Sequence, residues 1–512
     1  MDRLKRSTQN AIVGIFGQLF SVACNFATRM VFVRVLSQEY LGIEGLFSSL
    51  LVMLSLAELG VGSAIVYSLY EPLAKKDHEK IRALMRLYRI AYWTIAAVVA
   101  LLGILFSLRL EWFIKDMPDI PNLRLYFLLF VANTAISYLY SYKGTLIGAD
   151  QKQYVVNLWQ YLFTLIMCAA QVIVLLLTGS YLGFLICMVV ATFAQNLVIS
   201  IVTDRRYPFL KSKEPVQKVD EQTLSKIKKN TFALVLHKVA GIASTPATNL
   251  ILSIFVGLQV VAVYANYLLF TNALQRLISR VFDAAVASIG NLGVEETKEK
   301  QLRVFDLTFY INAFLSAIIS IPLLVVFTNT MRVFFGEKYV FPLGIEFAIA
   351  ALFYLKSIRS VALTFTSAYG LYWFTRWKAV IETIVLIVMS VVAAQLWGIL
   401  GILIANCFTS FFVSGAIEGY MLFKHGFEMP ARGYFVKLIA YVLGTFAAML
   451  AVWFILTPIP ETSLSTLLIR GVVSALIAVS VFFTATFWMP EFKGFWVMMK
   501  NIGGMLRQKI GA

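Results

Sequence analysis

Residues 26–71 read FATRMVFVRVLSQEYLGIEGLFSSLLVMLSLAELGVGSAIVYSLYE. The stretch holds the end of one long apolar segment that starts near residue 10, a short polar turn, and a second long apolar segment. A helix needs roughly 20 consecutive, mostly apolar residues to cross the hydrocarbon core of a bilayer. This part of the chain is therefore predicted to cross a membrane twice, as two helices joined by a tight turn.

The same pattern continues along the whole chain of 512 residues, which is 60% hydrophobic and only 14% charged. That composition lies outside the range of soluble globular domains. We predict an all-α integral membrane protein with about 14 transmembrane helices. The predicted spans are 10–34, 41–70, 87–108, 122–142, 153–178, 181–203, 230–256, 260–290, 304–328, 343–368, 378–397, 399–423, 435–457 and 465–488.

Positive charge is concentrated in every second connection between the spans. If the N-terminus is cytoplasmic, the cytoplasmic segments hold 31 Lys and Arg residues and the opposite loops hold 5. Because cytoplasmic loops carry the Lys/Arg excess, we predict a multi-pass protein of the bacterial cell (inner or plasma) membrane with both termini cytoplasmic. The net charge of +17 then reflects contact with anionic membrane lipids, and no nucleic-acid partner is expected.

A long basic connection divides the chain into two predicted lobes of six helices each, in a pseudo-twofold arrangement. The predicted parts are a lobe at 1–203, a basic cytoplasmic linker at 204–229, a lobe at 230–423, helices 13 and 14 at 424–488, and a cytoplasmic amphipathic tail at 489–512. A weak internal repeat, in which Ala27-Thr28 aligns with Ala247-Thr248, supports the division. Paired six-span repeats of one orientation are a transporter architecture.

Cofactor and metal motifs are missing from the sequence. The four cysteines lie singly in apolar segments, and the three histidines are far apart. The chain has no Gly-x-x-x-x-Gly-Lys-Ser/Thr phosphate loop. No metal, no cofactor and no direct use of ATP are therefore expected.

Polar side chains recur every three or four residues on one face of the first two helices of each lobe. Ionisable groups at bilayer depth are costly and are expected to face a cavity or a partner. The predicted polar lining of a cavity consists of Gln18, Asn25, Ser55, His237, Lys238, Asn249 and Asn272. The alternative is helix packing, which suits small and hydroxyl side chains, and Arg280 with Asp283 also fits a simple pair three residues apart.

A surplus of cations at depth remains after that alternative is considered. Arg29, Arg276, Lys356 and Arg359 face mainly one acid, Glu58. Arginine suits phosphate because its planar fork makes bidentate hydrogen bonds. We therefore expect a transporter of a phosphate-bearing anion. The predicted substrate-binding residues are Arg29, Arg276, Arg280, Lys356 and Arg359.

Acids in the spans are expected in two roles. Glu58 and Asp283 are the deep acids that could carry protons and couple transport to an ion gradient. Glu382 and Glu418 lie near predicted cytoplasmic helix ends and are expected to reach the headgroups.

Residues 26–71, the stretch YSYKGTLIGADQKQYVVN at 140–157, and the plan of six, six and two spans resemble one transporter family. It is the polysaccharide flippase branch of the multidrug/oligosaccharidyl-lipid/polysaccharide exporter superfamily. The resemblance implies alternating access of two lobes, which moves undecaprenyl-pyrophosphate-linked oligosaccharide units from the inner to the outer leaflet. It also implies a central cavity lined by spans one, two, seven and eight, where Arg29 and Arg276 would hold the pyrophosphate.

The resemblance places the protein in the biosynthesis of O-antigen, capsule or exopolysaccharide, with a polysaccharide polymerase and chain-length machinery as candidate partners. Two relatives of the same superfamily stay open as alternatives, a multidrug exporter and a peptidoglycan-precursor flippase. A polytopic glycosyltransferase or polymerase is disfavoured, because the chain has no Asp-x-Asp motif and no large exterior loop. We therefore predict that the protein is not an enzyme.

Overall fold

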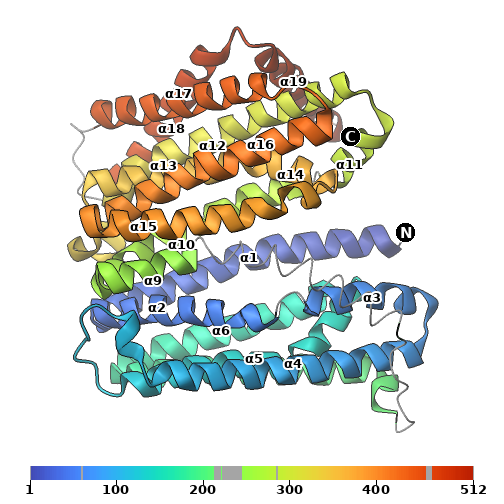
Figure 1. Ribbon diagram of the computed structural model, residues 1–512, viewed down its shortest axis with the longest axis vertical. Helices are drawn as coiled ribbons and strands as arrows, with labels where there is room; N and C mark the ends of the chain where they lie inside the picture. The colour runs from blue at the N-terminus through green and yellow to red at the C-terminus, as the bar shows by residue number, and fades with distance from the viewer. Residues whose placement is uncertain are drawn as a thin grey trace. The chain divides into compact units, whose positions relative to one another are not determined.

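The computed structural model describes residues 2–58, 61–212, 221, 245–283, 286–456 and 464–510. Within these ranges every regular element is a helix, so the prediction of an all-α fold is confirmed (Figure 1). The chain forms two compact units, Met1–Ala265 and Asn266–Ala512, and each is treated by itself.

The first unit is a bundle of long helices in which neighbours in sequence pack together. Helix α1 packs against α6, α5 lies between α4 and α7, and α2 contacts α9. The elements are α1 (Asp2–Val35), α2 (Gln38–Leu54), η1 (Ser55–Glu58), α3 (Val61–Lys75), α4 (His78–Ser107), η2 (Leu110–Phe113), α5 (Leu123–Ala149), α6 (Gln153–Thr178), α7 (Tyr181–Arg206), η3 (Pro208–Lys211) and α9 (Thr245–Phe255). Helix α10 (Leu258–Asp283) runs on into the second unit.

The second unit is built around one long helix, α12, which contacts α13, α17, α18 and α19. The elements after α10 are α11 (Val286–Glu295), α12 (Lys298–Phe335), η4 (Glu337–Tyr339), α13 (Leu343–Ile358), α14 (Ser360–Ala368), α15 (Tyr372–Phe408), η5 (Thr409–Gly415), α16 (Ala416–Leu422), η6 (Phe423–Phe427), α17 (Arg432–Leu456), α18 (Leu464–Thr486) and α19 (Pro490–Ile510).

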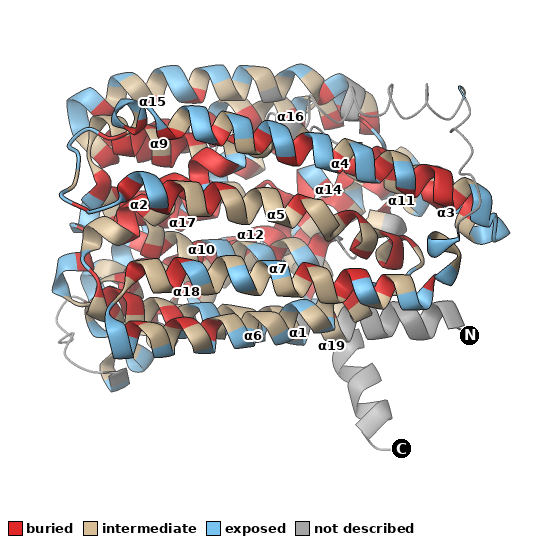
Figure 2. Cartoon of the chain, turned by 90° about the horizontal axis from the view of Figure 1, so that it is seen from below, coloured by how far each residue is buried: buried red, intermediate tan, exposed pale blue. Residues whose placement is uncertain are grey.

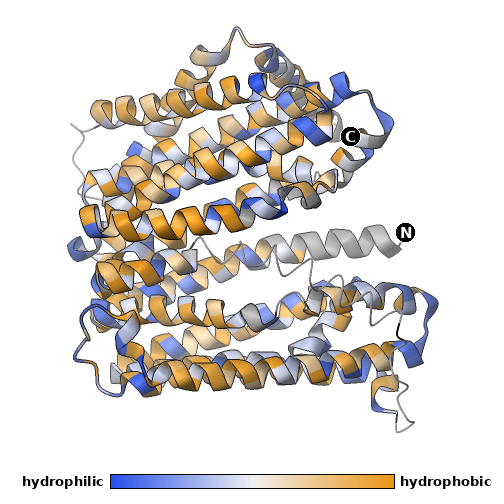
Figure 3. Ribbon diagram, viewed as in Figure 1, coloured by the Kyte–Doolittle hydropathy of each residue, from blue (hydrophilic) through white to orange (hydrophobic). Residues whose placement is uncertain are grey.

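The helices follow the predicted spans closely. Among the described residues, ten helices are long and apolar enough to cross a membrane. Each predicted span from 10–34 to 465–488 overlaps a helix. Four spans are described only in part, because residues 59–60, 230–244, 284–285 and 457 lie outside the described ranges. Figure 3 shows hydrophobic residues along the helices and hydrophilic residues at the connections. A count of about 14 spans is consistent with this arrangement.

The prediction of one continuous helix over 41–70 is wrong. Helix α2 ends at Leu54, the 3-10 turn η1 follows, and α3 begins at Val61. Glycines lower helix propensity, and the sequence Leu59-Gly60-Val61-Gly62 places two of them here. A carbon added at Gly62 would lie only 2.3 Å from the hydroxyl of Tyr92, so the close approach of α3 to α4 requires glycine.

The predicted boundary between spans 378–397 and 399–423 is confirmed. The continuous element α15 is interrupted at Gly398, whose φ of 57° and ψ of −135° are not helical. The two arms approach closely, because a carbon added at Gly401 would lie 2.2 Å from the carbonyl oxygen of Ala393. Glycine is needed at position 398 for the backbone conformation and at position 401 for the close contact.

Exposed residues run along many helices, as Figure 2 shows for α4 and α15, and many of them are large and apolar. Leu101, Ile104 and Leu105 of α4 and Leu176 and Leu177 of α6 are each at least half exposed. A soluble protein rarely exposes so much apolar surface, whereas acyl chains cover it in a membrane. The exposed apolar faces therefore agree with the membrane prediction.

Candidate functional site

The first polar face lies on α1 and carries Gln18, Asn25 and Arg29. Gln18 is half-buried, and Asn25 is exposed and donates its side-chain amide to the carbonyl of Ser21. Arg29 is half-buried and its Nη1 lies 3.2 Å from Oε2 of Glu44 on α2. Since a guanidinium has five N–H donors, this single contact leaves Arg29 able to bind a second anion.

The acid beside Arg29 is Glu44, whereas Glu58 was predicted from the sequence to be the main acid opposite the cations. Glu58 instead accepts a hydrogen bond of 2.7 Å from the hydroxyl of Tyr92. Glu58 is the last residue of η1, at the break after α2, and Tyr92 belongs to α4. The hydroxyl of Tyr88, also on α4, donates a hydrogen bond of 3.3 Å to the hydroxyl of Tyr92. Glu58 therefore belongs to a cluster of tyrosines at the broken helix, where discontinuous helices of membrane proteins commonly place functional groups.

Two further lining residues have packing partners. Ser55 donates its hydroxyl to the carbonyl of Val52 within its own helix end. Asn249 is buried and donates 3.0 Å to the hydroxyl of Ser49, where α9 packs on α2. The structure therefore puts Asn249 in a helix–helix contact, which is the packing alternative named above. His237 and Lys238 lie outside the described residues.

The second polar face lies on α10 in the second unit. Asn272, Arg276 and Arg280 follow one another at four-residue intervals and are all exposed. The Nε of Arg276 donates 3.2 Å to the carbonyl of Asn272, which holds the side chain along the helix. The side chain of Asp283 lies outside the described part of the chain, so its predicted pair with Arg280 stays a prediction.

The expectation that Arg359 lacks a matching acid is wrong. Arg359 lies between α13 and α14, and its Nε and Nη2 donate 2.9 Å and 2.7 Å to the two oxygens of Glu418. Lys378 of α15 also contacts Glu418 and lies 3.2 Å from Glu382, which is 3.9 Å from Arg359. We call Arg359, Lys378, Glu382 and Glu418 the ion cluster.

The ion cluster also corrects the expectation that Glu418 reaches the headgroups. Its side chain is 1% exposed. It sits on the short helix α16, between two π-helical stretches at Thr409–Gly415 and Phe423–Phe427. Such wide turns rotate side chains off the regular helical face and recur at functional positions. Lys356, one turn before Arg359, is half-buried and remains a candidate cation.

The buried acid Glu346 of α13 was not predicted from the sequence. Its side chain is fully buried and accepts hydrogen bonds of 2.6 Å from Tyr267 and of 2.6 Å from Thr328. A lone glutamate inside the apolar run Gly344-Ile345-Glu346-Phe347-Ala348 was a visible signal for it. Glu346 therefore adds a buried acid to those predicted from the sequence.

An apolar pocket of about 160 Å³ lies among α12, α17 and α18. Ile321, Ala448 and Phe482 are among the residues that line it. Helices α17 and α18 are the predicted spans 13 and 14. No group of three or more His, Cys, Asp or Glu residues able to hold a metal occurs among the described residues.

Comparison with known proteins identifies relatives in structure. No protein-family model matches the chain, and no curated protein matches it in sequence. The lipid II flippase MurJ in an inward closed conformation superposes with a TM-score of 0.65 at 12% identity, covering 93% of this chain and 98% of that chain. An inward-facing multidrug resistance MATE family transporter of the MOP superfamily gives 0.62 at 13% identity, covering 81% and 98%.

The Vibrio cholerae MATE transporter VcmN in its bent form gives a TM-score of 0.53 at 15% identity, covering 83% of this chain and 98% of that chain. All three relatives are membrane transporters by name, and each matches nearly its whole length. Identities this low establish the fold alone. The chain therefore has the fold of the MurJ and MATE transporters.

Proposed function

We propose that this protein is a flippase for lipid-linked oligosaccharides of the undecaprenyl-pyrophosphate type. It moves them from the inner to the outer leaflet of a bacterial cell membrane by alternating access, and so serves surface polysaccharide biosynthesis. The observation that carries the proposal is the pair of arginines on the polar faces of α1 and α10. Arg29 keeps most of its donors, and Arg276 is exposed and bonded only along its own helix among the described contacts.

A pyrophosphate is the chemical group that these side chains suit best. A guanidinium binds phosphate oxygens with two parallel hydrogen bonds, and it stays charged at every physiological pH. In the proposed mechanism Arg29 and Arg276 each contact the pyrophosphate at some stage of transport, with Arg280 and Lys356 as auxiliary cations. Arg359 is left out of this set because Glu418 satisfies its fork.

The lipid part of the substrate needs an apolar surface. The pocket among α12, α17 and α18 has an apolar lining and supports contact with an isoprenoid chain. A multidrug exporter of cationic compounds would instead need acids on its polar faces, and the exposed polar face of α10 carries arginines. The likeness to MurJ favours a second candidate, a flippase for a peptidoglycan precursor, which carries the same pyrophosphate.

The test replaces Arg29 and Arg276 by alanine and by lysine, one at a time, in the host cell. Alanine at either position is expected to abolish polysaccharide export while the amount of protein in the membrane stays normal. Lysine restores the positive charge but cannot make the two parallel hydrogen bonds of a guanidinium. Partial export by the lysine variant therefore indicates a point-charge site, and loss of export indicates bidentate binding. Glu44→Gln is the matched control for loss of the ion pair, because it breaks the contact of Arg29 and keeps the cation.

Normal export from both alanine variants would refute the proposal. The two candidate substrates are separated by deleting the gene. Loss of surface polysaccharide with normal growth supports the oligosaccharide flippase, whereas lysis with accumulation of cell-wall precursor supports the peptidoglycan alternative.

A further inference from the structure

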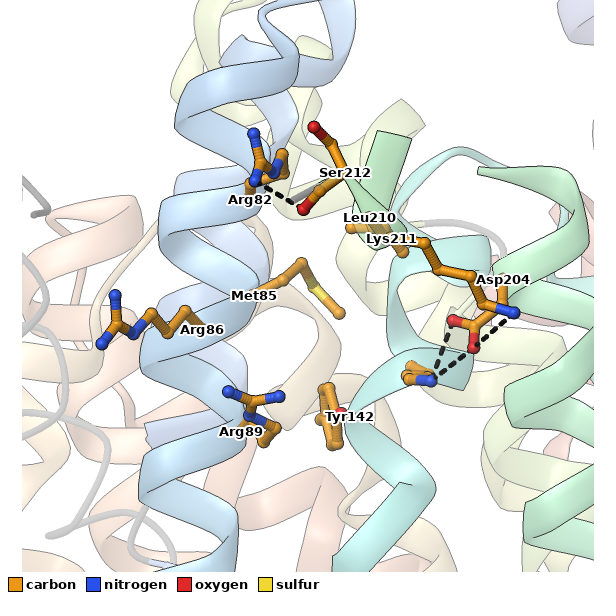
Figure 4. A pocket seen from close by; sticks show the side chains of 10 residues that line it. Arg82, Met85, Arg86, Arg89, Tyr142, Asp204, Leu210, Lys211 and Ser212 are labelled. Carbon is orange, nitrogen blue, oxygen red and sulfur yellow. Dashed lines mark hydrogen bonds and ion pairs between the residues drawn. The ribbon is translucent and has the colours of Figure 1, made fainter. Parts of the chain in front are cut away.

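A second, strongly basic pocket lies in the first unit, apart from the polar faces of α1 and α10. It encloses about 380 Å³ among α4, α5, α7 and η3 (Figure 4). That volume is within the range of roughly 300–1,000 Å³ found for small-molecule sites. Its charged lining consists of Arg82, Arg86, Arg89, Lys143, Lys211 and Asp204.

The charges of this pocket are far from balanced. Five cations line it against the single carboxylate of Asp204. Asp204 lies 2.8 Å from Lys143 and 3.7 Å from Lys211, so its one negative charge is already shared. Like charges gathered in a partly dry recess repel one another, and an anion bound among them would relieve that repulsion.

Two arginines of the pocket, Arg82 and Arg89, make contacts within the protein. Arg82 is buried and donates 3.0 Å from Nη2 to the carbonyl of Ser212, which ties the end of η3 to α4. The guanidinium of Arg89 lies over the ring of Trp93, 5.6 Å from its centroid. A pocket with fixed donors loses little side-chain entropy when it binds a ligand.

Figure 4 shows how the donors are arranged. Arg82 lies beside Ser212 and Arg89 lies beside Tyr142, with Met85 between the two arginines, and Asp204 and Lys211 lie across from α4. Arg86 extends from the other side of the helix. Since positions seven residues apart share a helix face, the sequence of α4 itself brings Arg82 and Arg89 together.

We propose that this pocket binds a phosphate-bearing anion of headgroup size. Arginine forks and lysine point charges together suit phosphate, and the pocket opens where α4 begins and α7 ends. The charge asymmetry predicts that these helix ends face the cytoplasm, where basic pockets between transmembrane helices bind anionic lipid headgroups. The same chemistry would accept a soluble phosphate compound. The proposal uses only the first unit and does not rest on the proposed transport function.

The experiment measures binding to the purified full-length protein in a neutral detergent. The probes are cardiolipin, phosphatidylcholine as the zwitterionic reference, and inorganic pyrophosphate as the soluble anion. The pocket variants are Arg89→Gln and Lys211→Gln, both at exposed side chains that tolerate a neutral amide. Arg205→Gln is the matched control, because Arg205 neighbours Asp204 on α7 and is exposed but does not line the pocket.

Each pocket variant is expected to bind the anionic probe at least about tenfold more weakly, since it loses a charge-assisted hydrogen bond. The Arg205→Gln variant should bind like the wild type. Cardiolipin binding that pyrophosphate does not displace identifies a lipid headgroup as the ligand, and binding or displacement by pyrophosphate identifies a soluble phosphate. Circular dichroism checks the helical content of every variant.

Two results would overturn the inference. One is binding of neither cardiolipin nor pyrophosphate above the level of phosphatidylcholine. The other is an equal loss in Arg205→Gln and in the pocket variants, which would show general attraction to a basic surface. If Arg89→Gln fails to fold, Lys211→Gln still decides the matter, because its side chain is 68% exposed.

Discussion

Replacing Glu418 by glutamine would leave the buried Arg359 and the half-buried Lys378 with Glu382 as the remaining acid of the ion cluster. Glu418 is 1% exposed and accepts two hydrogen bonds, of 2.9 Å and 2.7 Å, from Arg359. Removing one partner of a buried ion pair costs about 3–5 kcal/mol, because the remaining charge keeps its desolvation penalty. We expect the melting temperature of Glu418→Gln to fall by roughly 3–5 °C, because a chain of this length has an unfolding entropy of about 1 kcal/mol per kelvin.

The matched control is Glu382→Gln, in the same ion cluster. Glu382 is 21% exposed, and its contacts with Arg359 and Lys378 are longer, at 3.9 Å and 3.2 Å. Its loss should cost about 1 kcal/mol, because water still reaches the site. Thermal unfolding of the purified proteins in one detergent, followed by intrinsic fluorescence, compares the two variants directly.

The double variant Arg359→Gln with Glu418→Gln separates charge from packing. It removes one cation with one acid and leaves the pair of Lys378 and Glu382, 3.2 Å apart, intact. It should therefore be more stable than Glu418→Gln alone. Equal melting temperatures for the two single variants, or a double variant less stable than Glu418→Gln, would refute the reasoning.

Three further outcomes are expected. Glutamine at position 58 can still accept the hydrogen bond of Tyr92, so the melting temperature of Glu58→Gln should match that of the wild type. Its transport in liposomes should lose the response to an imposed pH gradient. An unchanged response would show that Glu58 is only a structural partner. Gly62→Ala should destabilise the protein by about 1–3 kcal/mol, because the added carbon would lie 2.3 Å from the Tyr92 hydroxyl, and Gly14→Ala, with open space around it, should not. A reporter fused at Asp116 should read exterior, and a cytoplasmic signal there would contradict the predicted topology.

Some of the structure follows from sequence because it depends on local properties of the chain. The spans on α4, α6 and α7 were predicted to within a few residues at most ends, since an apolar run of bilayer length is visible in one dimension. The turn at Gly398 was also predicted, because the pattern of two shorter apolar runs requires a break there. The break after Leu54 was missed, although its two glycines were a signal for it.

Partners of the charged residues could not be predicted from the sequence. Arg359 and Glu418 are 59 residues apart and meet only because α14, α15 and α16 pack together. Arg29 has Glu44 rather than Glu58 beside it, because α2 breaks before Glu58 and directs that carboxylate to Tyr92. These contacts decide which cations have an acid beside them and which are left to bind another anion.

The sequence by itself determined that the chain is helical and apolar enough to be membrane-embedded, where its helices lie, and that cations occur within its apolar segments. Apolar length and helical periodicity are sufficient for those conclusions. The tertiary structure alone decided which cations are neutralised, which remain exposed on α10, and which gather with Asp204 in the basic pocket. The physical reason is that an ion pair forms over a few ångströms in space, and the fold of each unit sets that distance between residues far apart in the chain.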